Sequence, residues 1–206
     1  MRDRLSPVVM NVYSSGDFHR VDMRTIAREA GMSFRTIYRY FVDKETLLFW
    51  FIDHWLKGLY PAALMPLDGN AEMRTKLLGV LTAHFAFYEE NPNVGRIIFM
   101  TVPLERWMRD PSYAQRELIM RMLHEIKEGQ QRGELRRDLD SLMMFDAFSA
   151  LFNRAFLMWE YRGRRYSLTG QAAPLLSILW NGIAAVAPPS KPIASTHTPS
   201  RKRAAG

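Results

Sequence analysis

Two arginines four positions apart, Arg35 and Arg39, share one face of a segment with helical spacing. Phe34, Thr36 and Tyr40 also face outward from this segment. Guanidinium groups suit an anionic partner, and nucleic acid is the first to consider because the whole chain has a formal net charge of +7. The same pattern is typical of the solvated charged face of an ordinary helical hairpin, so the neighbouring residues must distinguish the two.

The residues that would position this face have the offsets of a helix-turn-helix. Ala27 is small and lies where two short helices would cross closely. Gly31 follows four residues later, where the chain must turn sharply, and glycine reaches a left-handed conformation without steric cost. Ile37 lies six residues beyond Gly31, on the inner face of the second helix. The spacing therefore favours a binding surface over a simple solvated hairpin.

The rest of the chain also has helical spacing, and no run alternates with a period of two. We predict an all-α fold, in which a small helical module precedes longer helices. Ser6 and Pro7 are expected to begin the first helix as its cap and first residue. The caps expected for the next three helices are Asp22, Ser33 and Asp43. Their expected ends are near Gly31, Phe41 and Tyr60, and the later helices are expected near residues 71–90, 94–108, 112–131, 139–163 and 168–187.

The composition excludes several classes of chemistry. The 206 residues include no cysteine, which removes disulfides, Cys-ligated metals and thiol catalysis. No phosphate-binding glycine loop, serine-nucleophile motif or metal-binding histidine pair occurs, so we predict no cofactor, no metal and no enzyme. The apolar run from Ala172 to Ala187 is too short for a membrane span, and the N-terminus lacks a secretion signal. We expect a cytoplasmic protein with no membrane partner.

The basic charge is unevenly distributed along the chain. Residues 1–57 carry nine basic and seven acidic side chains, residues 58–187 carry fifteen and fourteen, and residues 188–206 carry four and none. We expect the last segment to be a disordered basic tail because it is rich in Pro, Ser, Thr and Ala. The charge suited to nucleic acid lies from Arg24 to Lys44, where five basic side chains outnumber two acidic ones.

The stretch from Val21 to Leu48 resembles the DNA-binding domain of the TetR family of transcriptional regulators. Its most specific parts are Ala-Gly-Met-Ser at 30–33, Thr-Ile-Tyr-Arg-Tyr-Phe at 36–41 and Asp-Lys-Glu-Thr-Leu-Leu at 43–48. The likeness extends over roughly residues 4–57. It implies an N-terminal three-helix DNA-binding domain with a helix-turn-helix in residues 1–57. It also implies a larger helical ligand-binding and dimerisation domain in residues 58–187.

The resemblance also assigns roles in DNA binding. The helix from Ser33 to Tyr40 would lie in the major groove, with Arg35 as the best candidate for a bidentate contact to guanine. Arg24 would reach a base or a phosphate, and Lys44, at the start of the fourth helix, would bind a phosphate. The implied DNA-binding residues are Arg24, Ser33, Phe34, Arg35, Thr36, Tyr38, Arg39, Tyr40 and Lys44.

Departures from the family pattern leave a second hypothesis open. Asp17 stands where the family usually has a glycine, and Val21 replaces a commonly polar residue, which leaves Asp22 as the cap of the second helix. An acidic side chain at that point would lie near the DNA phosphates. The alternative is a helical small-molecule-binding or interaction protein that has lost specific DNA binding.

Large apolar residues recur at helical spacing in residues 58–187, and the default interpretation of such a stripe is a core. In a TetR-like protein some of them would instead line a cavity for a small hydrophobic effector. Polar groups suited to orienting that ligand include His84, Tyr88, His124, Asn153 and Arg154. The implied lining residues are Phe85, Tyr88, Phe99, Trp107, Met120, His124, Phe148, Phe152 and Phe156.

The last two predicted helices carry too few charges for a solvated face. Between Leu142 and Trp159 there are two charged residues, and none occurs from Tyr166 to Ser190. Such helices must be buried on more than one side, and in TetR-like proteins a second copy of the chain supplies the other side. The implied interface residues are Leu151, Met158, Leu176, Leu179, Trp180 and Ile183.

These features together predict a homodimeric, ligand-responsive regulator, in the first instance a repressor. Its two recognition helices would enter successive major grooves of a palindromic operator, about 34–36 Å apart. A small hydrophobic effector would release it from the double-stranded DNA.

Overall fold

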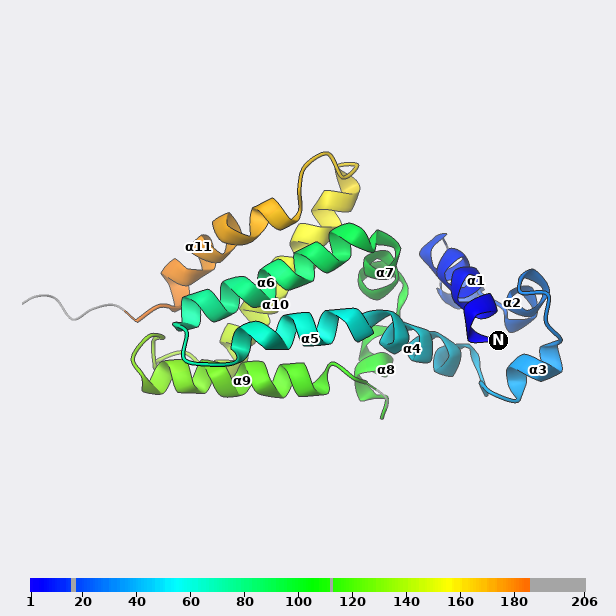
Figure 1. Cartoon of the computed structure of the whole chain (residues 1–206), viewed down its shortest axis with the longest axis horizontal. Helices are drawn as coiled ribbons and strands as arrows, with labels where there is room; N and C mark the ends of the chain where they lie inside the picture. Colours follow the sequence, from blue (N-terminus) through cyan, green and yellow to red (C-terminus); the bar gives the residue numbers. More distant parts are fainter. Residues whose placement is uncertain (16–17, 112, 186–206) are drawn as a thin grey trace, which may run out of the picture.

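The computed structural model describes residues 1–15, 18–111 and 113–185 (Figure 1). These ranges are helical, and the backbone within them contains no strand beyond an isolated bridge between Leu135 and Ala184. The prediction of an all-α fold is therefore confirmed. Two features of the sequence, Asp17 and the basic tail expected at 188–206, lie outside the described residues.

The described helices follow one another through the whole chain. Short turns join several of them, including the 3-10 turn η1 (Phe18–Arg20) and the π-helical turn η4 (Ile97–Thr101). The α-helices are α1 (Arg2–Ser15), α2 (Met23–Glu29), α3 (Phe34–Tyr38), α4 (Lys44–Trp55), α5 (Leu59–Leu64), α6 (Met73–Glu90), α7 (Pro92–Arg96), α8 (Leu104–Arg109), α9 (Arg116–Gln131), α10 (Ser141–Tyr161) and α11 (Ala172–Ile183).

Helix α1 begins earlier than the sequence pattern predicts. Pro7 lies inside the helix, where proline lacks the N–H for one helical hydrogen bond. Leu5, Val9 and Tyr13 are fully buried, and the burial of this apolar stripe offsets the lost bond. Arg4 also requires the longer helix, because its guanidinium donates to the main-chain oxygens that end α2, at 3.1 Å each.

The starts of α2, α3 and α4 confirm the predicted caps. The side chains of Asp22, Ser33 and Asp43 each accept a hydrogen bond from a backbone N–H in the first turn of their helix. Gly31, between α2 and α3, has a φ of +60°, the left-handed conformation for which glycine was expected. Ile37 is fully buried, as the helix-turn-helix spacing requires.

Several predicted helix bounds are wrong. The helix expected over 94–108 is divided into α7, η4 and α8, because Pro103 cannot continue a helix that precedes it. The helix expected to reach Tyr60 ends at Trp55, and α3 ends before Phe41. The last helix stops at Ile183, where the chain becomes extended and pairs with the loop after α9.

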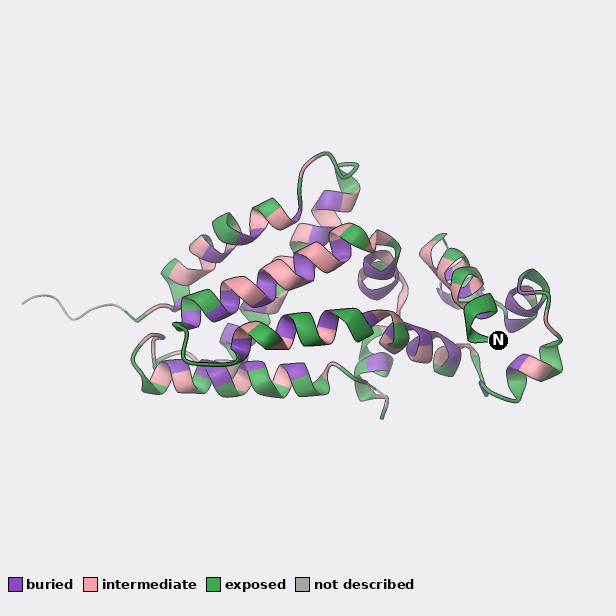
Figure 2. Cartoon of the chain, viewed as in Figure 1, coloured by how far each residue is buried: buried purple, intermediate pink, exposed green. Residues whose placement is uncertain are grey.

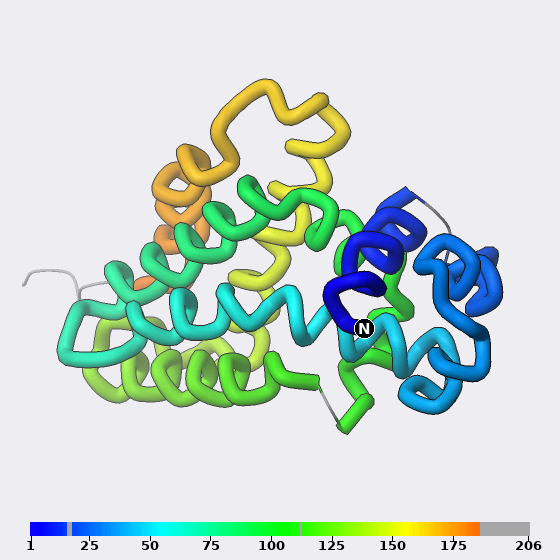
Figure 3. The backbone as a smooth tube through the Cα atoms, turned by 45° about the vertical axis from the view of Figure 1, so that its right-hand side comes forward, coloured from blue at the N-terminus to red at the C-terminus, as the bar shows by residue number. Residues whose placement is uncertain are grey.

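The buried side chains form a continuous cluster that holds the N-terminal helices to the longer ones. Figure 2 shows them as stripes along the helices, with exposed residues on the outer faces. In the tube view of Figure 3, α1, α2 and α3 gather at one end, and α6, α9 and α10 form the body. None of the described helices has the length and apolar character needed to cross a membrane.

Candidate nucleic-acid interface and effector cavity

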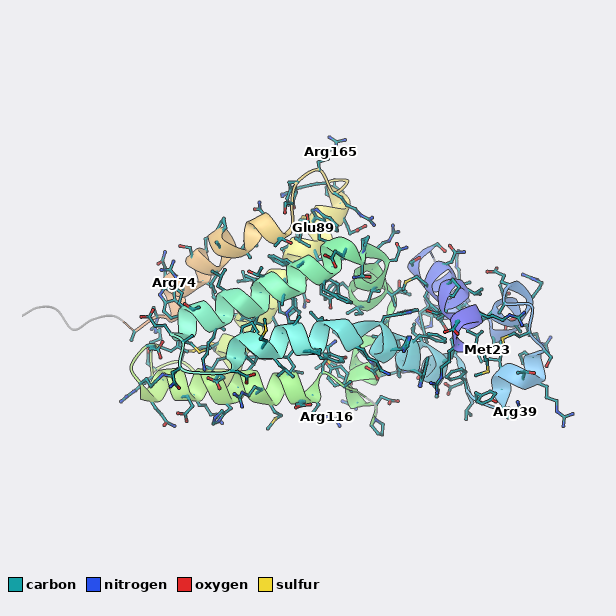
Figure 4. All side chains as sticks on the ribbon, viewed as in Figure 1. Met23, Arg39, Arg74, Glu89, Arg116 and Arg165 are labelled. Atoms are coloured by element: carbon teal, nitrogen blue, oxygen red, sulfur yellow. The ribbon has the colours of Figure 1, made fainter. Side chains whose placement is uncertain are left out.

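The short helix α3 lies at one end of the molecule (Figure 1), and its basic residue Arg35 and the following Arg39 are exposed. Arg35 is exposed, and its side chain makes no hydrogen bond or ion pair with the described residues, so the N–H donors of its guanidinium are free. Figure 4 shows Arg39 projecting from the same end. A surface groove of about 500 Å³ runs along this helix, lined by Ser33, Arg35, Thr36, Tyr38 and Arg39.

Aromatic rings set the position of the other cationic groups around α3. The rings of Phe34 and Tyr38, one turn apart, have centroids separated by 4.3 Å. The guanidinium of Arg24, from α2, lies 5.6 Å from the centroid of the Phe34 ring, which holds it beside the start of α3. Arg39 lies 5.0 Å from the ring centroid of Tyr40 and donates a hydrogen bond to its hydroxyl at 3.2 Å.

Lys44 lies apart from this surface and is already engaged. Its ammonium donates to the main-chain oxygens of Phe18, His19 and Val21 at 2.9, 3.1 and 3.3 Å. It also lies 4.6 Å from the centroid of the Phe18 ring. An ammonium has three donors, and all three are used here. The geometry therefore supports a structural role, in which Lys44 fixes the turn before α2, in place of the expected phosphate contact.

The larger group of helices encloses an apolar cavity of about 330 Å³, within the range of ligand pockets. Its walls come from α6, η4, α8, α9 and α10. Of the nine residues proposed from the sequence, five line it: Tyr88, Phe99, Trp107, Phe148 and Phe152.

The other four proposed residues lie elsewhere. Phe85 and Phe156 are fully buried in the core but do not line the cavity. Met120 and His124 are exposed, because both lie on the outer face of α9. The face of α9 that points into the cavity is turned away from the face that carries Met120 and His124. It contributes Leu118, Ile119 and Met122 to the lining. The sequence contained this signal, since Arg121 and other charged residues mark the outer face.

Among the polar groups proposed to orient a ligand, three line the cavity: His84, Tyr88 and Asn153. His84 is buried and its ring stacks on Phe152, with 4.8 Å between centroids. Its Nδ1 lies 2.8 Å from the main-chain oxygen of Val80, and burial lowers the pKa of the imidazole, which is therefore neutral at pH 7. Asn153 also lines the cavity, whereas Arg154 is exposed on a groove between α10 and α11.

The π-helical turn η4 connects the cavity with the N-terminal helices. Phe99 lines the cavity, and two residues later Thr101 Oγ1 donates a hydrogen bond to the main-chain oxygen of Tyr13 in α1 at 3.1 Å. In the next helix, Arg106 forms an ion pair with Glu45 of α4. These two contacts join this wall of the cavity to α1 and α4.

The six residues proposed for an interface between two copies fall into two groups. Leu176 and Ile183 are buried in the chain's own core, where α11 packs against α6. Ile178, which is not among the six, is 70% exposed on the opposite face of α11. The remaining four are half-buried: Leu151, Met158, Leu179 and Trp180.

No group of three or more histidine or carboxylate side chains within the described ranges is arranged to hold a metal ion. The fold and the exposed α3 surface instead define a helix-turn-helix protein with a larger helical domain. Residues 10–49 match the family described as "Bacterial regulatory proteins, tetR family". The N-terminal part of the chain therefore carries the DNA-binding domain of the TetR family of transcriptional regulators.

Similar proteins with this fold are regulators. The chain is 22% identical to the fatty acid metabolism regulator protein of Bacillus subtilis over 182 residues, which cover 84% of this chain and 91% of that protein. The crystal structure of the regulator FadR from Bacillus subtilis in complex with stearoyl-CoA gives a TM-score of 0.76 at 19% identity, covering 89% of this chain and 100% of that one. The ketosteroid transcriptional regulator KstR2 of Mycobacterium tuberculosis gives 0.70 at 18% identity, covering 90% and 95%.

Proposed function

We propose that this transcriptional regulator is a homodimeric repressor that binds a palindromic DNA operator and is released by a small hydrophobic effector. Residues 1–57 would contact DNA, and residues 58–187 would bind the effector and the second copy. The observation that carries the proposal is the double contact of η4, which lines the cavity on one side and bonds to α1 on the other. A double-stranded DNA partner also favours a cytoplasmic location.

Specific DNA binding is supported by the α3 surface. Arg35 is exposed with free donors, and a guanidinium of this kind can pair with O6 and N7 of guanine. Arg24 and Arg39 flank it and would add contacts to phosphates or bases. Asp22 does not argue against this role, because its carboxylate is occupied in capping α2. The capping bond accounts for an acidic residue at this position.

The effector proposal is supported by the cavity. Aromatic and aliphatic side chains make up most of its lining, and Met108 and Met122 add adaptable apolar surface. Two regulators of similar fold are associated with compounds that have a hydrocarbon body: FadR is in complex with stearoyl-CoA, and KstR2 is a ketosteroid transcriptional regulator. We therefore assign the effector to apolar compounds with a hydrocarbon body.

The homodimer proposal is supported by the outer faces of α10 and α11. No charged residue occurs in α11, and Ile178 is exposed there beside the half-buried Leu179. A groove of about 300 Å³ separates the two helices and is lined in part by Leu151 and Met158. A second copy related by a two-fold axis would cover this apolar face and place two α3 helices on one DNA.

Regulation would follow from differential binding. An effector that enlarges the cavity would displace η4, and through Thr101 and Tyr13 this displacement would change the placement of α1 and α3. The effector then binds the released form more tightly than the DNA-bound form, and DNA must lower effector affinity by the same factor.

Selection of bound sequences from a random pool of duplexes tests the proposed function. We expect enrichment of a palindromic motif whose half-sites lie about one helical turn apart. Gel-shift titrations on the selected motif should then show weaker binding when an apolar effector is added. Failure to enrich any motif would instead favour the alternative, a ligand-binding protein without specific DNA binding. Sedimentation of the free protein as a monomer at micromolar concentration would contradict the dimer.

A further inference from the structure

Two residues that line the cavity each have a buried polar atom that makes no hydrogen bond within the described part of the chain. One is Nε1 of Trp107 in α8, and the other is Oγ of Ser149 in α10. Both side chains line the cavity. The side chain of Trp107 is 1% exposed, so solvent does not satisfy its N–H. An unpaired buried donor is unfavourable and rare, and it calls for a partner that enters the site.

The charge of the lining limits what that partner can be. Among the described residues that line the cavity there is no lysine or arginine, and the sole formally charged one, Asp146, is negative and exposed. The imidazole of His84 supplies no positive charge at pH 7, because burial keeps it neutral. An anionic group would therefore lose its hydration here and gain no counter-charge.

The hydrogen-bonding chemistry of the two unpaired groups narrows the choice further. An indole N–H can only donate, so its partner must be an acceptor. A hydroxyl can donate or accept, so Ser149 suits the same oxygen or a neighbouring polar atom. Most of the remaining wall is apolar, with Phe99, Phe148 and Phe152 among its residues. One acceptor on a hydrocarbon body matches this lining.

Resting on the proposed function, in which this cavity holds the effector, we propose that the buried part of the effector is uncharged and carries an oxygen acceptor for the N–H of Trp107. The hydroxyl of Ser149 makes the second polar contact. Ketones, esters and thioesters share this chemistry, whereas a free carboxylate does not. A thioester with a large anionic headgroup fits only if that headgroup stays outside the cavity.

Calorimetric titration of the full chain with matched eight-carbon compounds tests the assignment. The compounds are 2-octanone, 1-octene, octanoate and octanoyl-CoA. We expect 2-octanone to bind about tenfold more tightly than 1-octene or octanoate, the effect of one or two hydrogen bonds. If octanoyl-CoA binds with the same affinity as 2-octanone, the acceptor comes from a thioester. If octanoyl-CoA binds more weakly than 2-octanone, the acceptor comes from a free neutral molecule. Octanoate that binds as tightly as 2-octanone overturns the proposal.

Two substitutions connect the affinity to the named atoms. Trp107→Phe removes the indole N–H and Ser149→Ala removes the hydroxyl. Each should weaken 2-octanone about tenfold but leave 1-octene within about twofold, because the alkene makes no hydrogen bond. An equal loss for both compounds would mean that the substitutions disturb packing alone, which overturns the assignment. Trp50→Phe and Ser177→Ala, which lie outside the cavity, are the matched controls and should change neither affinity.

Failure of this effector assignment can be distinguished from failure of the proposed function. If 2-octanone binds with the expected dependence on Trp107 but no compound changes DNA affinity, the assignment stands and the proposed regulation fails. If 1-octene releases DNA as effectively as 2-octanone, and with equal affinity, the regulation stands and the assignment fails.

Discussion

Replacing Lys44 with methionine should destabilise the protein and leave the salt dependence of DNA binding unchanged. The ammonium of Lys44 donates to three main-chain oxygens, those of Phe18, His19 and Val21. Methionine keeps most of the aliphatic side chain, and it removes all three donors. The turn η1 and the start of α2 then lose the group that joins them to α4.

The expected magnitude follows from the burial of those bonds. A buried hydrogen bond to a charged group contributes about 1.5–3 kcal/mol, and a bond near the surface contributes less because the freed oxygen regains water. Two of the three bonds are partly buried and one is exposed. We therefore expect the free energy of unfolding to fall by about 2–3 kcal/mol in total. For a chain of this length, that corresponds to a decrease in Tm of about 4–12 °C.

Circular dichroism on heating measures the stability, and fluorescence anisotropy with labelled duplex at several salt concentrations measures the salt slope. Binding is measured well below the Tm of the variant, so that unfolding does not contribute. Lys57→Met is the matched control, because Lys57 is exposed and makes no hydrogen bond or ion pair within the described residues. The reasoning is refuted if Lys44→Met keeps its Tm and loses about 0.9 from the slope of log affinity against log salt, the signature of one lost phosphate contact.

Four further predictions concern other parts of the molecule. Arg35→Ala should lose about 1–3 kcal/mol of discrimination between the selected operator and random duplex, measured by gel shift, and equal discrimination would contradict a base contact. Thr101→Val removes the hydrogen bond to α1, so an effector should reduce DNA affinity severalfold less than in the parent protein. Gly95→Ala should lower the free energy of unfolding by about 1–3 kcal/mol, because the new Cβ would lie 2.4 Å from a ring carbon of the fully buried Phe156. Burial raises the pKa of the Glu89 carboxyl, but hydrogen bonds from the Thr169 hydroxyl and from backbone N–H groups outweigh it, so the pKa is lowered. The ionised Glu89 carboxylate therefore stabilises the fold above the pKa that this carboxyl has in the unfolded chain, and the stabilisation is lost as the pH falls through its lower pKa in the folded protein. Glu89→Gln should make the free energy of unfolding fall less steeply with decreasing pH, as measured by urea titrations in acid.

Local patterns in the sequence predicted local structure well. Asp22, Ser33 and Asp43 cap their helices because a short polar side chain can reach its own first turn without help from distant residues. Gly31 adopts the left-handed conformation for a similarly local reason. The surface at Arg35 was predictable too, because the buried face of a short helix fixes its exposed face.

The features that the sequence did not predict depend on tertiary contacts. Pro7 marks a helix start in isolation, but the burial of neighbouring apolar residues extends α1 beyond it. The engagement of Lys44 depends on three backbone oxygens from a preceding turn, which no spacing within α4 indicates. His124 was assigned to the cavity by residue type alone, and the rotational phase of α9 places it outside. Ser149 was missed because a lone serine in an apolar helix carries no distinguishing pattern.

The extended segment after α11 fixes the position of the last described residues. Arg136 donates its backbone N–H to Ile183 at 3.0 Å, and Ala185 donates its own to Glu134 at 2.9 Å. These bonds hold the end of α11 beside the loop between α9 and α10, at the opposite end of the molecule from α3 (Figure 1). A surface linker attached at Ala185, the last described residue, would therefore lie at the far end from the recognition helix. Immobilised protein can then serve directly in the selection of DNA sequences.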